Sequence, residues 1–191
     1  MRQRLLIILI FTTLYTIIRY VLFGNVELIH IPAYVLNKSV SMASAIFLFI
    51  AAFNFRQANS KRVKYWGSSA YHGAIVHILL SFAILSKPYY PKFFTSEKMN
   101  FIGELTIMLG VLAAYFFWTT RNGKSNFISK PFLQVLAALF VAAHVFVMGF
   151  SGWIRISEWH GYMPPVSMIS FVLAATSFIL FLYHRKQDGN V

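Results

Sequence analysis

Residues 132–150 read FLQVLAALFVAAHVFVMGF, a run of nineteen residues with no charged side chain and a single histidine, His144. As one helix, a run of this length spans the roughly 30 Å hydrocarbon core of a bilayer. Five further stretches have a similar length and composition, with polar or turn-forming segments between them. The six predicted transmembrane helices cover residues 5–23, 34–53, 66–85, 101–118, 132–150 and 165–183. The sequence therefore predicts an all-α integral membrane protein, a six-transmembrane-helix bundle in a single domain over residues 1–191.

The composition agrees with this class and excludes several others. Hydrophobic residues make up 58% of the 191 residues and charged residues only 12%, whereas soluble domains are about a quarter charged. The net charge of +12 does not indicate nucleic-acid binding, because the basic residues lie between apolar runs and form no stripe on a polar surface. The chain has no cysteine, which excludes disulfides, thiolate metal sites and c-type haem attachment. A metal or haem would need histidine, methionine or oxygen ligands.

The distribution of Lys and Arg predicts the orientation of the bundle. With the N-terminus inside, eleven of these residues lie on the cytoplasmic side, four lie on the outer side, and two lie within the helices. Short cytoplasmic loops carry an excess of positive charge. We therefore expect cytoplasmic N- and C-termini and a multi-pass location in the cell (inner) membrane.

Three of the six histidines fall inside predicted helices: His72, His77 and His144. Ionisable residues within a membrane span are costly and are functional candidates by default. His77 lies 12 residues after Tyr65, and His144 lies 13 residues after Pro131, so the two sit at matched depth, roughly 18–20 Å from the inner boundary. Such a pair could supply both axial ligands of a haem iron. Spacing alone leaves open that each is a hydrogen-bonded packing residue.

Three further residues are candidates for binding a cofactor. His72 lies five residues before His77 and therefore about 140° around the helix from it; we interpret it as a packing residue or as part of a quinone site or a second cofactor site. Arg19 and Lys38 lie in the outer thirds of the first and second helices. We expect them to bind haem propionates, the alternative being that they reach the outer lipid head groups.

The start of the third helix carries a family motif. Residues 61–67 read KRVKYWG, and His77 follows ten residues after Gly67. This stretch resembles the basic-x-x-Gly-x9-His pattern of the ferric-reductase-like transmembrane domain superfamily. That superfamily includes the haem subunit of the bacterial periplasmic methionine sulfoxide reductase and the membrane core of NADPH oxidases. Further similarities, within a region from about residue 34 to 180, are Asn37-Lys38, Gly103-Glu104 through Gly110, Gln134 through His144, and Met163-Pro164-Pro165.

The resemblance implies one b-type haem, held non-covalently by His77 and His144, that relays electrons across the membrane. The donor would be a cytoplasmic flavoprotein or a quinol, with a flavin or quinone at the cytoplasmic side, and the acceptor a redox partner on the outer side.

Two departures from the family pattern matter. A second haem would need histidines 14 residues from each ligand, where this chain has other residues: Val63, Pro91, Lys130 and Glu158. No glycine-rich phosphate loop is present. The resemblance therefore implies the electron-transfer subunit of an oxidoreductase, and not a complete NAD(P)H reductase.

Three alternatives remain open at this point. The first is a quinone-linked cytochrome b of another family. The second is a proton- or ion-coupled transporter whose path would use His72, His77, His144 and Glu104. The third is a structural subunit of a membrane complex without its own cofactor. Haem content separates the first alternative from the other two.

Overall fold

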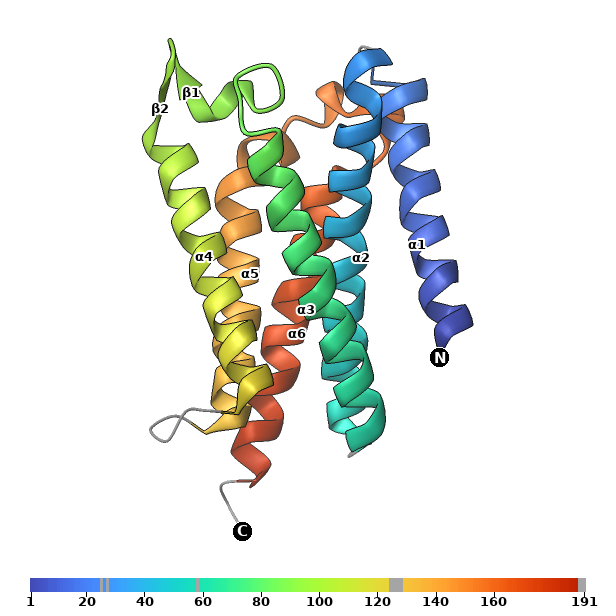
Figure 1. Cartoon of the computed structure of the whole chain (residues 1–191), viewed down its shortest axis with the longest axis vertical. Coiled ribbons are helices and arrows are strands. Elements are labelled where there is room, and N and C mark those ends of the chain that lie inside the picture. The colour runs from blue at the N-terminus through green and yellow to red at the C-terminus, as the bar shows by residue number, and fades with distance from the viewer. Residues whose placement is uncertain (25, 27, 58, 124–128, 189–191) are drawn as a thin grey trace.

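The computed structural model describes the chain from residue 1 to 188, apart from residues 25, 27, 58 and 124–128. The described residues form six long helices that run back and forth along one axis (Figure 1). They are α1 (Arg2–Ile17), α2 (Ile31–Arg56), α3 (Ser60–Ala83), α4 (Phe101–Asn122), α5 (Lys130–Trp153) and α6 (Val166–Asp188). The all-α prediction is confirmed, and each of the six predicted segments is helical.

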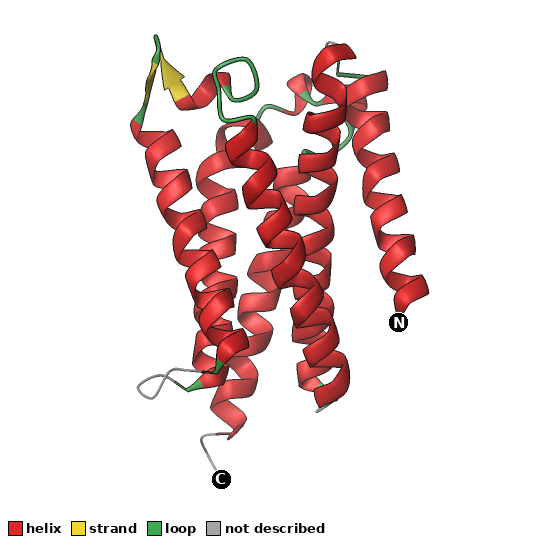
Figure 2. Ribbon diagram, in the orientation of Figure 1, coloured by secondary structure: helices red, strands yellow, loops and turns green. Residues whose placement is uncertain are grey.

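Short elements complete the described chain. A π-helix, Ile18–Leu22, continues α1, and 3-10 turns lie at Leu28–His30, Pro91–Phe93, Ile156–Glu158 and His160–Tyr162. A two-stranded hairpin of β1 (Phe94–Thr95) and β2 (Lys98–Met99) lies between α3 and α4 in the chain, at one end of the bundle (Figure 2). We call the end of the bundle that carries this hairpin the hairpin end.

Five helical segments are long and apolar enough to cross a membrane, judged by length and composition. They are Arg2–Leu22, Ile31–Phe55, Phe101–Asn122, Lys130–Trp153 and His160–His184. The predicted third span, residues 66–85, lies in α3 up to Ala83, and α3 is not among these five segments. Its first turns carry Lys61, Arg62 and Lys64, and its body contains serines, glycines and two histidines. The chain therefore has the features of a helical multi-pass membrane protein that contacts lipid.

Polar residues cap the N-terminal ends of two helices and determine where these helices begin. Asn59 Oδ1 accepts a hydrogen bond from the Arg62 amide at 3.2 Å, so α3 begins at Ser60. Asn100 Oδ1 does the same for the Gly103 amide at 3.1 Å. The polar segment between the second and third predicted helices is therefore shorter than the sequence suggested, because α2 ends at Arg56 and α3 already begins at Ser60.

The helices pack closely around the bundle except between α3 and α4. α2 packs along α3 and α6, and α5 packs along α4 and α6, while α1 lies outside against α2. α3 and α4 make few contacts with each other. α2, α3, α5 and α6 contribute to a buried cluster that contains Phe47, Trp66, Ala138 and Phe181. The helices α2–α6 thus surround an interior that is less tightly closed between α3 and α4.

Candidate functional site

A cavity of about 250 Å³ lies inside the ring of helices α2–α6. We call it the central cavity. Its walls are mainly apolar and include Leu48, Ile78 and Val141. The structure brings His77 of α3 and His144 of α5 to the same cavity, as their matched depth in the sequence suggested.

The His77 ring is held by a polar network with α2. Its Nδ1 lies 2.6 Å from Asn37 Oδ1, which also accepts a hydrogen bond from Ser81 Oγ at 3.2 Å. Asn37 is 1% exposed and donates from Nδ2 to Tyr90 Oη at 2.6 Å. Because the amide oxygen can only accept, His77 carries its proton on Nδ1 and keeps a lone pair on Nε2.

The His144 ring is held in the same tautomer by a backbone group. Its Nδ1 lies 2.8 Å from the carbonyl oxygen of Thr106 on α4. The ring approaches α4 closely at Gly110, where an added Cβ would lie 3.1 Å from Nδ1. A glycine at this position therefore leaves the imidazole room to reach the Thr106 carbonyl.

Both rings carry the lone pair on Nε2 that a metal ligand requires. In each, Nδ1–H donates to an acceptor of another helix, and no described residue makes a hydrogen bond to Nε2. A second partner that fixes the tautomer in this way is the usual arrangement of metal-ligating histidines. No group of three or more His, Asp or Glu side chains converges anywhere among the described residues. Two imidazoles in an apolar cavity fit an iron that brings its other ligands in a porphyrin ring.

Lys38 places a positive charge at the hairpin end of the central cavity, which it lines. Its Nζ lies 5.2 Å from the ring centroid of Tyr34 and 5.7 Å from that of Tyr90. Both distances are within the range of cation–π attraction. Among the described residues no carboxylate pairs with Lys38, so the ammonium is available to an anionic group in the cavity.

Arg19 lies elsewhere than the sequence suggested. It is 3% exposed, lies in the π-helix after α1, and does not line the central cavity. Its Nη1 donates to the carbonyl oxygen of His160 at 3.3 Å and to that of Met163. Arg19 therefore neither extends to the lipid head groups nor reaches the histidine pair; it ties the end of α1 to the segment before α6.

His72 also lies outside the central cavity. Its side chain is exposed, and its Nε2 lies 2.9 Å from Arg121 Nη1 of α4. The Arg121 guanidinium in turn lies 4.9 Å from the ring centroid of Tyr71. Because a guanidinium only donates, His72 Nε2 is the acceptor in this hydrogen bond.

Sequence reasoning missed the residues that orient the two histidines. Asn37 carried a signal, since a buried amide in an apolar helix needs partners. Thr106 carried none, because it acts through its backbone carbonyl. In comparisons with known proteins, no family model matches the chain and no relative is found among curated proteins.

Proposed function

We propose that this chain holds one b-type haem between His77 and His144 and relays electrons across the cell (inner) membrane. The observation that carries the proposal is the pair of imidazoles on one apolar cavity, each with Nδ1–H engaged and with no hydrogen bond to Nε2 from a described residue. The motif at residues 61–67 and its spacing to His77, which resemble ferric-reductase-like membrane domains, support the same function.

The proposed topology has six spans, which are the five apolar segments and α3. Its less apolar composition suits a helix whose polar residues serve the interior, as His77 and Ser81 do through Asn37. The excess of positive charge at the opposite end of the bundle supports a topology with both termini in the cytoplasm. The hairpin end then faces the outside.

The protein's own residues would bind and orient the cofactor. His77 and His144 would ligate the iron through Nε2, while Asn37 and the Thr106 carbonyl hold the two rings. Lys38 would offer its ammonium to a propionate at the hairpin end. When bound, the haem supplies one-electron chemistry, which the protein tunes through ligands, burial and hydrogen bonds.

The proposed donor is a cytoplasmic flavoprotein or a quinol, and the proposed acceptor is a redox partner on the outer side. Lys61, Arg62 and Lys64 are exposed on the first turns of α3. This basic surface would attract an acidic flavoprotein by electrostatic steering. In this scheme the chain is the electron-transfer subunit of an oxidoreductase and needs a separate protein or quinol to provide electrons.

The test is the haem content of purified protein expressed with a haem supply. We expect roughly one haem per wild-type chain and a b-type reduced-minus-oxidised spectrum. His77→Ala and His144→Ala should each lose the haem, while His72→Ala, a matched control outside the cavity, should keep it. A folded wild-type protein without haem would refute the proposal and favour a transporter or a structural subunit.

A further inference from the structure

A second cavity, of about 260 Å³, adjoins the central cavity at the hairpin end. We call it the tyrosine cavity, because four tyrosines line it: Tyr20, Tyr34, Tyr89 and Tyr90. Two lysines, Lys38 and Lys92, line it as well, and Lys38 also lines the central cavity. The described residues that line the tyrosine cavity include no carboxylate. Its polar side chains therefore offer two ammonium groups and several hydroxyls but no anion.

The two ammonium groups lack a counter-charge. Lys92 Nζ donates to the carbonyl oxygen of Met148, and Lys38 Nζ lies over the Tyr34 and Tyr90 rings. Neither forms an ion pair with a described carboxylate. The Lys92 side chain is exposed in part, but partial burial, together with the positive charges of Lys38 and Arg155, lowers the pKa of Lys92 to about 8. An anion between the two lysines would relieve this repulsion.

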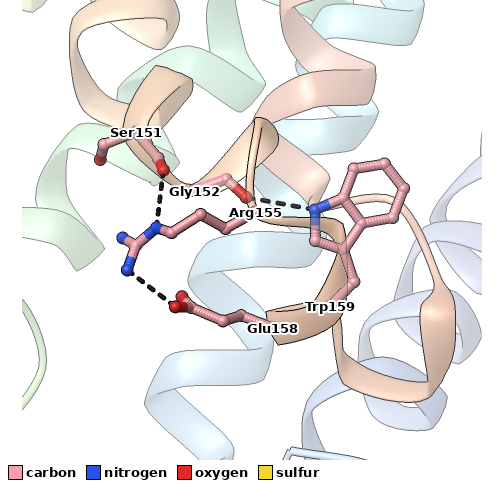
Figure 3. A network of polar contacts seen from close by, with 5 residues as sticks. All are labelled: Ser151, Gly152, Arg155, Glu158 and Trp159. Carbon is pink, nitrogen blue, oxygen red and sulfur yellow. Dashed lines mark hydrogen bonds and ion pairs between the residues drawn. The ribbon is translucent and has the colours of Figure 1, made fainter.

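The carboxylate of Glu158 does not supply the missing counter-charge, because it is paired with Arg155. Arg155 Nη1 lies 2.9 Å from Glu158 Oε1, and Arg155 Nε donates to the Ser151 carbonyl at 3.0 Å. Both contacts are drawn as dashed lines in Figure 3. In the same network, Trp159 Nε1 donates to the Gly152 carbonyl at 3.1 Å. Gly152 lines the tyrosine cavity. This network therefore shapes one wall of the tyrosine cavity. Because the Glu158 carboxylate is paired with Arg155, it does not neutralise Lys38 or Lys92, and both lysines remain available to a ligand.

Two further features favour a carboxylate as the anion. The first turn of α6 borders the cavity at Ser167, and the N-terminal end of a helix attracts negative charge. The remaining wall is apolar and includes Pro91, Met148 and Pro165. A carboxylate attached to an apolar body satisfies both the ammonium groups and this wall. Tyr90 Oη accepts from Asn37, so its own proton is free to donate to such a ligand.

We propose that the tyrosine cavity is a carboxylate-binding site in which Lys38 and Lys92 hold the anion. The carboxylate has two possible sources: a propionate of a haem in the central cavity, or a free organic acid that enters from the hairpin end. The site is inferred from the residues that line the tyrosine cavity. Only the first source of the carboxylate, a haem propionate, rests on the proposed function. Lys92 is the residue that sequence reasoning did not assign to any site.

The first arm of the test uses haem-free protein in detergent with benzoate as the probe and benzyl alcohol as its uncharged analogue. If the site accepts a free acid, benzoate raises the unfolding temperature and benzyl alcohol does not. Lys92→Gln should weaken benzoate binding about tenfold or more, as expected when a charged partner is lost. Lys98→Gln, in the exposed strand β2, is the matched control and should bind as the wild type, and Lys92→Arg should restore binding.

The second arm compares haem with haem dimethyl ester, whose propionates carry no charge. If the carboxylate is a propionate, wild-type protein and Lys98→Gln bind haem about tenfold or more tighter than the ester, and Lys92→Gln loses this preference. Either a Lys92-dependent benzoate effect or a Lys92-dependent preference for free propionates supports the site and identifies its source. Absence of both overturns it. If no haem binds at all, the proposed function fails, and the benzoate arm alone decides the site.

Discussion

Replacing Asn37 by leucine tests how the protein orients its proposed haem ligand. Leucine has the same branched arrangement of side-chain heavy atoms as asparagine but cannot accept from His77 Nδ1 or Ser81 Oγ, and it cannot donate to Tyr90 Oη. The side chain is 1% exposed, so water cannot easily take its place. The Ser81 hydroxyl, 3.4 Å from His77 Nδ1, is the nearest substitute acceptor.

The structure sets the size of the expected effect. Interhelical hydrogen bonds in membrane proteins contribute about 0.6 kcal/mol on average and at most about 1.7 kcal/mol. Three such bonds are lost, so we expect the free energy of unfolding to fall by roughly 2 kcal/mol, and by no more than about 5 kcal/mol. Loss of the residue that orients a metal-ligating histidine typically weakens metal binding about 10–100-fold. We expect a loss of haem affinity in that range.

The assay is titration of haem into haem-free protein, followed by redox potentiometry. Ser81→Ala is the matched control, because it leaves the Asn37–His77 contact in place, and it should bind haem within about threefold of wild type. Asn37→Asp keeps an acceptor and adds negative charge, so it should retain haem and lower its reduction potential. The reasoning is refuted if Asn37→Leu binds haem with wild-type affinity and potential.

Three further predictions follow from individual contacts. Gly110→Ala places a Cβ 3.1 Å from His144 Nδ1, so haem absorption should shift and affinity fall. Gly67→Ala, whose Cβ meets nothing within 4 Å, should leave both unchanged in the same titration. Arg19→Gln should lower the unfolding temperature in detergent while the haem spectrum stays as in wild type, since Arg19 bonds carbonyls and not the cavity; loss of haem would contradict this assignment. Benzoate affinity, measured calorimetrically, should fall as pH rises through about 8, where the Lys92 ammonium loses its proton; an affinity independent of pH would contradict it.

The sequence predicted the helices well where apolar residues form long runs, and less well elsewhere. α3 shows the limit: its histidines, serines and glycines lower its hydropathy, although it packs along α2 like a membrane helix. Several helix ends were predicted too short; the start of α3 is one, because the Asn59 cap extends this helix into polar sequence that hydropathy does not detect.

The candidate site was predictable to the extent that depth along a helix determines position. Matched depth indicated His77 and His144, and both line the central cavity. Depth could not predict the contacts of Arg19, because its carbonyl partners lie more than 140 residues away in sequence. It also could not find Lys92, since only the folded connection between α3 and α4 brings this lysine to the same cavity as Lys38.

Low-temperature electron paramagnetic resonance of the oxidised, haem-loaded protein tests the central claim most directly. A single iron held by two imidazoles is low-spin and six-coordinate. We predict such a signal in wild-type protein, and its replacement by a high-spin signal, or its loss, in both His77→Ala and His144→Ala. A high-spin signal in wild type, or a low-spin signal that survives either substitution, would contradict ligation of one haem by this histidine pair.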